Sequence, residues 1–423
     1  MSEPNSQVTD KPFMWHHHVS LWFSLGVGLL VIQMGSFLSP SLGTRDALLV
    51  IVMGSVIGAG ILAYVARLGQ QTGLNSAQLM QKTFGTGFAK LPIILNIFQL
   101  LGWTAFELVI MSEGSMEVLN EATLLGFDGI FWHAAFVILW CILLYALVRG
   151  TMVTMVRKFA SKFMLPLVII SLIWLTYQFI GRLDGGVTAF LDKDGKGGMP
   201  LMKAMDLVLA MPISWLPLVC DYSRHGRSPR STLSGTWLGY AFANIWCYGL
   251  GFLIVSAAPN DIGLVATILL AQGGLLALGL IIIDELDNAY GDTYSGATSS
   301  AQLNSKINFE TAAIAIIIVA GFAAVFLPMH DLEKFLILIS SIFLPLFGVI
   351  LGRFAKAGKA LEAITPIYVW PAAIIWVLGI AMFHFLTLQA PHIGATLPVF
   401  VAMFVLAFLF KSAELPRAFP EKC

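Results

Sequence analysis

The chain has 423 residues, of which 58% are hydrophobic and only 11% are charged. Soluble proteins carry about 25% charged residues, so this composition excludes a soluble fold and predicts an all-helical protein that crosses a lipid bilayer several times. The formal net charge is zero, which gives no sign of a nucleic-acid partner. The four cysteines show no paired spacing, and we expect no cofactor, disulfide or structural metal.

Apolar stretches long enough to span a bilayer recur along the whole chain. A spanning helix needs about 20 apolar residues. By this measure the chain contains twelve predicted spans, at about 19–40, 46–66, 87–112, 129–148, 160–181, 203–221, 233–257, 263–299, 307–328, 334–352, 366–386 and 395–411. Lysine and arginine gather in alternate loops, as at Arg157 and Lys158, so the positive-inside rule predicts a protein of the cell inner membrane with both termini in the cytoplasm.

Two of the predicted spans are interrupted. The first contains Gly26, Gly28 and, at its end, Pro40, and the sixth contains Pro212 and Pro217. Proline removes a backbone donor, and broken backbone persists in a membrane only where it lines a cavity or is buried in protein. Interruptions five spans apart are typical of secondary transporters built from inverted repeats. Kinked packing helices are the alternative for either span taken alone.

The same spacing divides the chain into four parts. Residues 1–18 form a predicted cytoplasmic tail, and residues 19–185 form a first repeat of five spans. Residues 186–355 form a second repeat of five spans, and residues 356–423 hold two peripheral spans and the C-terminal tail. The expected architecture is therefore five plus five helices with two more outside the repeat.

The eighth predicted span carries four acidic residues, in the run I-I-I-D-E-L-D-N-A-Y-G-D-T-Y-S-G-A-T-S-S of residues 281–300. A carboxylate at membrane depth costs about 2.5–3.5 kcal/mol on insertion scales, so it must face a cavity, a partner or an ion. Helical spacing puts most of these polar residues on one face: Asp284, Asp287, Asn288, Gly291, Asp292 and Ser295. Glu285 lies off that face by about a third of a turn. This pattern predicts a polar pocket that tolerates cations, with a cytoplasmic loop as the alternative.

The third span places Gln99, Trp103 and Glu107 on one helix face, at intervals of four residues. An indole can stack on a planar ring, while amide and carboxyl groups can bond to the edge of the ring. With Trp215 of the sixth span on the other side, this set suits a nucleobase-like heterocycle. The alternatives are that the tryptophans pack or anchor the helices and that Glu107 pairs with a buried polar group.

These motifs, taken in order, resemble nucleobase–cation symporter family 1, the cytosine, hydantoin and allantoin permeases. The matching segments are Ile32–Ser36, Gly69–Leu74 with Phe84-Gly85, Gln99 with Gly102-Trp103, Asp221–Gly226 and Tyr294-Ser295. Within the family, the third-span segment 99–107 and the sixth-span segment 212–217 look most similar to the hydroxymethylpyrimidine transporters associated with thiamine synthesis.

The resemblance implies the leucine-transporter architecture, with substrate held between spans one, three, six and eight. The residues that it implies for substrate contact are Gln33, Gln99, Trp103, Ser214, Trp215 and Asp284, and Glu107 joins them from its place on the third-span face. It also implies a cation site made by the carbonyls of Leu29 and Ile32 and by two side chains of the eighth span. The family has hydroxyls at those two positions, where this chain has Asp287 and Asn288, so the coupling ion is sodium or a proton.

From these observations we expect an importer that works by cation-coupled alternating access and is no enzyme. The expected substrate is hydroxymethylpyrimidine, with cytosine or another nucleobase as the alternative, and Asp284 is the expected contact for its amino group and ring nitrogen. Asp221 and Arg224 close the sixth span as a gate or a helix-end pair. The competing hypotheses are a membrane enzyme, disfavoured because no H-E-x-x-H motif occurs, and a channel. The oligomeric state stays open.

Overall fold

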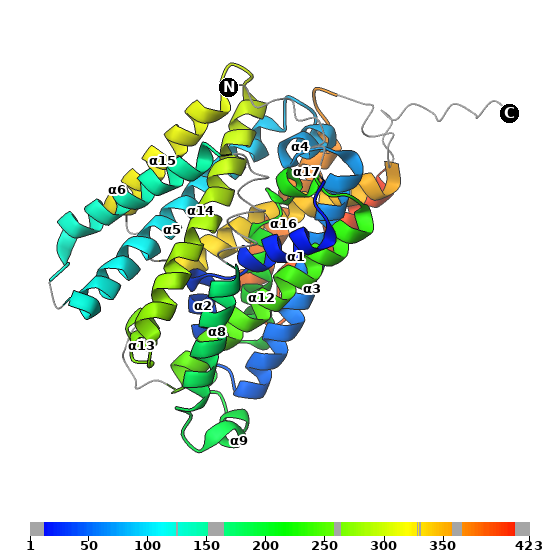
Figure 1. The fold of residues 1–423 in the computed structure, drawn as a ribbon. Coiled ribbons are helices and arrows are strands. Elements are labelled where there is room, and N and C mark those ends of the chain that lie inside the picture. The colour runs from blue at the N-terminus through cyan, green and yellow to red at the C-terminus, as the bar shows by residue number, and fades with distance from the viewer. Residues whose placement is uncertain are drawn as a thin grey trace.

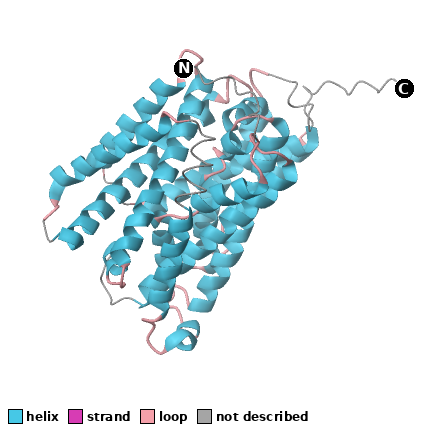
Figure 2. Ribbon diagram, viewed as in Figure 1, coloured by secondary structure: helices cyan, strands magenta, loops and turns pink. Residues whose placement is uncertain are grey.

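The computed structural model describes residues 12–123, 126–150, 165–257, 264–327, 329, 331–357 and 366–410, which are almost entirely helical (Figures 1 and 2). Seven of these helices are long and apolar enough to cross a membrane: α3 (Thr44–Thr72), α5 (Lys90–Thr123), α6 (Gly129–Val148), α12 (Pro229–Ala257), α15 (Phe309–Phe326), α16 (Leu332–Ala357) and α17 (Trp370–Gln389). Two further helices, α1 (Trp15–Ser24) and α2 (Leu29–Ser36), meet at a short break with a bend of 61°. Counted together, they form an eighth span. The expected helical, multi-pass fold is confirmed.

The other helices are shorter, or carry charged residues: α4 (Ser76–Phe84), α8 (Leu165–Ile180), α9 (Gly186–Leu191), α10 (Leu201–Ser214), α11 (Val219–Ser223), α13 (Leu264–Leu269), α14 (Gly274–Leu303) and α18 (Thr396–Leu409). Each of the twelve predicted ranges overlaps a helix or a pair of helices. The count of twelve spans and the inverted repeat stay predictions. Residues 1–11 of the predicted tail 1–18, residues 411–423 and the basic loop around Arg157 lie outside the described residues, whereas residues 15–18 of that tail belong to α1.

Helix α14 carries the acidic stretch and packs against several other helices. Figure 1 shows it running beside α5 and α15, and α5 is the element with which it shares its most extensive packing. Every residue from Asp284 to Ser299 is buried, so this half of the helix is covered on all sides by protein. The acidic stretch is therefore no loop at a helix end, because its side chains lie inside the bundle.

Helix α12 packs closely against both halves of the first broken span. A Cβ added at Gly35 of α2 would lie 2.2 Å from the Tyr248 carbonyl oxygen, and one added at Gly251 would lie 1.8 Å from the Ile32 carbonyl oxygen. Only glycine permits backbones to approach this closely. The glycines therefore hold α2 against α12, and they set where the first span can bend.

We expect Gly251→Ala to destabilise the protein by about 1–3 kcal/mol, because the new methyl group pushes α12 away from α2. The melting temperature of the purified protein in detergent measures this effect. Gly249→Ala is the matched control, since a Cβ at Gly249 on the same helix meets no atom within 4 Å. Equal melting temperatures for the two variants would contradict the close contact.

Candidate functional site

The first break, between Leu25 and Gly28, is held by two side chains of α14. The Leu29 backbone N–H donates a short hydrogen bond to Glu285 Oε1. Asn288 Nδ2 donates to the Val27 carbonyl at 3.2 Å and to Glu285 Oε2 at 3.0 Å. A helix start has unpaired N–H groups and a partial positive charge, so a carboxylate there stabilises α2. Gly28 makes the approach possible, since a Cβ there would lie 2.9 Å from both Glu285 oxygens.

The second break separates α10 from α11. Helix α10 ends at Ser214, whose hydroxyl donates to the Met211 carbonyl at 2.7 Å. Pro217 cannot donate a backbone hydrogen bond. The Pro217 carbonyl accepts a hydrogen bond from Asn96 Nδ2 of α5 at 3.3 Å, so α5 supports the break between α10 and α11.

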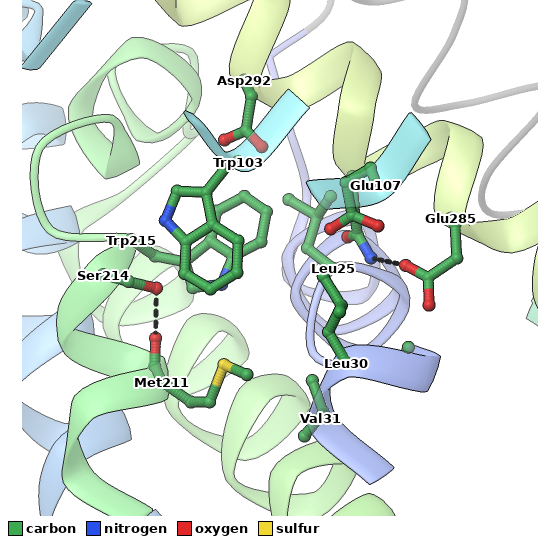
Figure 3. Close-up of a pocket in the computed structure, with 12 residues that line it drawn as sticks. Leu25, Leu30, Val31, Trp103, Glu107, Met211, Ser214, Trp215, Glu285 and Asp292 are labelled. Carbon is green, nitrogen blue, oxygen red and sulfur yellow. Dashed lines mark hydrogen bonds between the residues drawn. The ribbon is translucent and has the colours of Figure 1, made fainter. Parts of the chain in front are cut away.

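A cavity lies where the two breaks meet. Its lining comes from four helices and from both breaks: Leu25, Gly28, Leu30, Val31, Trp103, Glu107, Met211, Ser214, Trp215, Glu285, Asn288 and Asp292. Figure 3 shows the carboxyl groups of Asp292, Glu107 and Glu285 along the top and right of the cavity, with Met211 and Val31 below. The cavity has a volume of only about 20 Å³. A heterocyclic ring would therefore enter only after side chains move.

The cavity combines aromatic walls with carboxyl groups. Trp103 and Trp215 both line it, and Trp103 also packs edge-on against Phe335 at 5.3 Å between ring centroids. Glu107 is buried and lies beside the carboxyl group of Glu285, and Glu107 Oε2 has no hydrogen-bond donor. The arrangement offers flat surfaces for a ring and free acceptors for the N–H groups at its edge.

A second acidic cluster lies outside the cavity lining, at the end of α1. Ser24 Oγ is 3.2 Å from Asp284 Oδ1 and 3.1 Å from Asp287 Oδ2, within hydrogen-bonding distance of both. Both carboxyl groups are fully buried, and Asp284 Oδ2 and Asp287 Oδ1 have no donor. Two buried carboxyls around one hydroxyl form a receptacle for a small cation or a proton.

The structure brings four of the seven predicted substrate residues to the cavity, namely Trp103, Glu107, Ser214 and Trp215. Gln33, Gln99 and Asp284 do not line it. Gln33 lies in the second turn of α2, because the break falls before residue 29. Gln99 Nε2 instead donates to Asn96 Oδ1 at 3.0 Å, and Asp284 faces Ser24.

The predicted cation ligands are not assembled as expected. Leu29 and Ile32 lie within α2, and the Ile32 carbonyl faces Gly251 of α12 rather than α14. The carbonyl that meets Asn288 is that of Val27, while Asp287 reaches Ser24. Within the described ranges, no group of three or more histidine, cysteine, aspartate or glutamate side chains is arranged to hold a metal ion.

Asp221 and Arg224 take helix-end roles. Asp221 Oδ1 accepts a hydrogen bond from the Ser76 backbone N–H at 3.1 Å, at the start of α4. Arg224 Nε donates to the backbone carbonyl of Asp221 at 3.3 Å. These contacts tie α11 to the short helix between the second and third spans, and a gating role stays a prediction.

Sequence reasoning did not name Glu285 or Asp292 as substrate contacts, although it placed Asp292 on the face of a polar pocket, and it missed the apolar lining at Leu25, Leu30 and Met211. Both acids belong to the acidic run of the eighth predicted span, and Asp292 lies on its predicted polar face. Glu285 lies off that face, so helical spacing alone does not place it at the pocket. In the structure its carboxyl reaches the broken backbone of the first span, a contact that no pattern within one helix encodes.

Comparison with known proteins shows the family to which the chain belongs. The family of permeases for cytosine and purines, uracil, thiamine and allantoin matches residues 4–410. The chain belongs to this family, nucleobase–cation symporter family 1. It is therefore a multi-pass membrane transporter and not an enzyme.

The matches to individual proteins cover most of each chain. The cytosine permeases of Escherichia coli O157:H7 and of Escherichia coli strain K12 are each 24% identical to this chain over 374 residues. The matched region covers 83% of this chain and 81% of each permease. Mhp1 in a closed conformation with bromovinylhydantoin bound superposes with a TM-score of 0.75 at 15% identity, covering 94% of this chain and 91% of Mhp1. A Na⁺-coupled sialic acid symporter superposes with a TM-score of 0.62 at 15% identity, covering 95% of this chain and 90% of its own. At these identities the structures show a shared fold.

Proposed function

We propose that this permease imports a nucleobase-like heterocycle, which binds in the cavity between Trp103 and Trp215. The observation that carries the proposal is the cavity itself, where two indoles and free carboxyl acceptors meet at two broken helices. Broken helices in a membrane transporter supply backbone groups for a ligand near the middle of the bilayer. Family membership and the cytosine permease relatives support a ligand of this class.

The proposed first substrate is hydroxymethylpyrimidine, and the second is cytosine. Both are planar rings that carry an amino group next to a ring nitrogen. Glu107, with its free oxygen, can accept from the amino group while an indole stacks on the ring. Because Asp284 lies outside the cavity lining, Glu107 replaces it as the proposed contact.

The proposed coupling cation binds at Ser24, Asp284 and Asp287. Carboxyl and hydroxyl oxygens suit sodium, and a carboxylate can also take up a proton. The cluster touches α1 beside the break, so its occupancy affects the half-span that borders the cavity. The ion drives transport only if it binds the substrate-ready conformation better than the other conformation.

The proposal also includes the membrane arrangement expected from the sequence. We place the twelve spans as two inverted repeats of five and two peripheral helices, in the cell inner membrane with both termini in the cytoplasm. The two broken spans, at α1–α2 and at α10–α11, correspond to the first helix of each repeat. Alternating access would then move one group of helices against the other around the cavity.

A ligand screen on the purified protein tests the proposed function. Hydroxymethylpyrimidine, cytosine, uracil, hydantoin and allantoin are each added with sodium, without sodium and at two pH values, and the melting temperature is recorded. We expect one aminopyrimidine to raise the melting temperature most, and sodium or low pH to increase that rise. If none of the five compounds stabilises the protein, the proposal is refuted. If only hydantoin or allantoin does so, the proposal that the substrate is an aminopyrimidine is refuted.

A further inference from the structure

The carboxyl groups around the cavity have no basic partner in its lining. Three acids line the cavity, Glu107, Glu285 and Asp292, and no lysine, arginine or histidine lines it. The charged groups that act on Glu107 within the described residues are themselves acidic. All three acids are buried. Positive charge at this place must therefore come from bound protons or from the ligand.

The energetic requirement is strict. An isolated ionised carboxylate transferred to an apolar interior costs on the order of tens of kcal/mol unless it is paired or neutralised. The coupling cation proposed above does not meet the requirement here, because its cluster at Ser24 lies outside the cavity lining. The carboxyl groups of the cavity are therefore either protonated or paired with a positively charged ligand.

The three acids differ in what they already bind. Glu285 accepts hydrogen bonds from the Leu29 backbone N–H and the Asn288 side chain, and its carboxyl group also lies against that of Glu107. Glu107 keeps a buried oxygen without a donor, in a cavity whose other walls include Trp103 and Trp215. A planar cation would satisfy both features, because its N–H groups pair with the carboxylate and its face packs on the indoles.

We infer that the ring is bound as a cation, with an amidinium-like edge that pairs with Glu107. Glu107 is then the residue that selects a positively charged ring over a neutral one of the same shape. This inference rests on the proposed function, since it names the charge of the ligand that occupies the same cavity.

Two probes of equal shape test it: benzamidine, a planar cation at neutral pH, and benzamide, its neutral counterpart. Their dissociation constants are measured with the purified full-length protein. We expect benzamidine to bind at least about tenfold more tightly, because a hydrogen bond to a charged group is worth about 1.5–3 kcal/mol. Glu107→Gln is expected to bring the two dissociation constants close together.

Two further variants keep the result interpretable. Glu107→Asp retains the charge and should retain the preference, and Glu117→Gln removes an exposed acid from the same helix and should leave the preference unchanged. Equal binding of the probes by the unaltered protein, no binding of either, or a preference that survives in Glu107→Gln would overturn the inference.

Cytosine, largely neutral at pH 7, separates this inference from the proposed function. If cytosine binds and Trp103→Ala abolishes that binding, the cavity holds a heterocycle as proposed, whatever the probes show. Failure of benzamidine under those conditions overturns only the cationic form of the ligand. Failure of all heterocycles, with the benzamidine preference intact, overturns the proposed substrate class and leaves the cationic cavity standing.

Discussion

Trp103→Ala is expected to weaken binding of the transported ring by roughly 5- to 150-fold, since stacking of a base on an aromatic side chain is worth about 1–3 kcal/mol. The indole lines the cavity from α5 and is backed by Phe335. Its removal takes away the flat surface while leaving Glu107 to bind the edge of the ring. Equilibrium binding of cytosine and of hydroxymethylpyrimidine to the purified protein measures the loss.

Two controls accompany this variant. Trp370→Ala removes a tryptophan that is 58% exposed on α17 and does not line the cavity, and it should leave affinity unchanged. Trp103→Phe keeps an aromatic face and should retain part of the affinity, which separates stacking from the loss of packing that any large-to-small change causes. Unchanged affinity in Trp103→Ala would mean that the ring binds elsewhere.

Asp287→Ala is expected to abolish accumulation of substrate against a gradient while sparing insertion into the membrane. The change removes one of the two carboxyl groups around Ser24, and with it an essential part of the proposed cation receptacle. A carrier that no longer binds its ion can equilibrate its substrate but cannot concentrate it. Uptake into proteoliposomes, with and without an imposed ion gradient, distinguishes these two behaviours.

The matched control is Asp192→Asn, at an exposed acid that pairs with Arg45 at 2.5 Å. This variant should accumulate substrate as the unaltered protein does. Full accumulation by Asp287→Ala would remove Asp287 from the coupling mechanism.

The Asp284→Asn variant tests whether Asp284 contacts the substrate or belongs to the proposed cation site. The sequence predicted that Asp284 contacts the substrate, whereas the structure puts it beside Ser24 with Asp287. We now expect this variant to lower the response of uptake to the ion gradient and to change ring affinity little. A large loss of affinity, with the ion response intact, would restore the substrate contact. The same proteoliposome and binding measurements give both quantities.

Much of the fold could be read from composition and periodicity, because each depends on the residues of one helix at a time. Apolar runs of about 20 residues identify spans without reference to any neighbour. Trp103 and Glu107 were predicted to share a face because helical geometry alone places residues four apart together. The acids of α14 were predicted to point inward, since carboxyl groups are too costly against lipid, and residues 284–299 are indeed buried.

The tertiary structure alone decided where the first span breaks and which acid faces the cavity. Several glycines of that span permit a break, and the observed one, before Leu29, depends on Glu285 reaching across from α14 and on α2 lying against Gly251. Neighbouring helix residues point about 100° apart, so the rotation of α14 determines whether Asp284 or Glu285 meets the cavity. That rotation is set by packing against α5 and α8, which are distant in sequence, and a pattern within one helix carries no information about it.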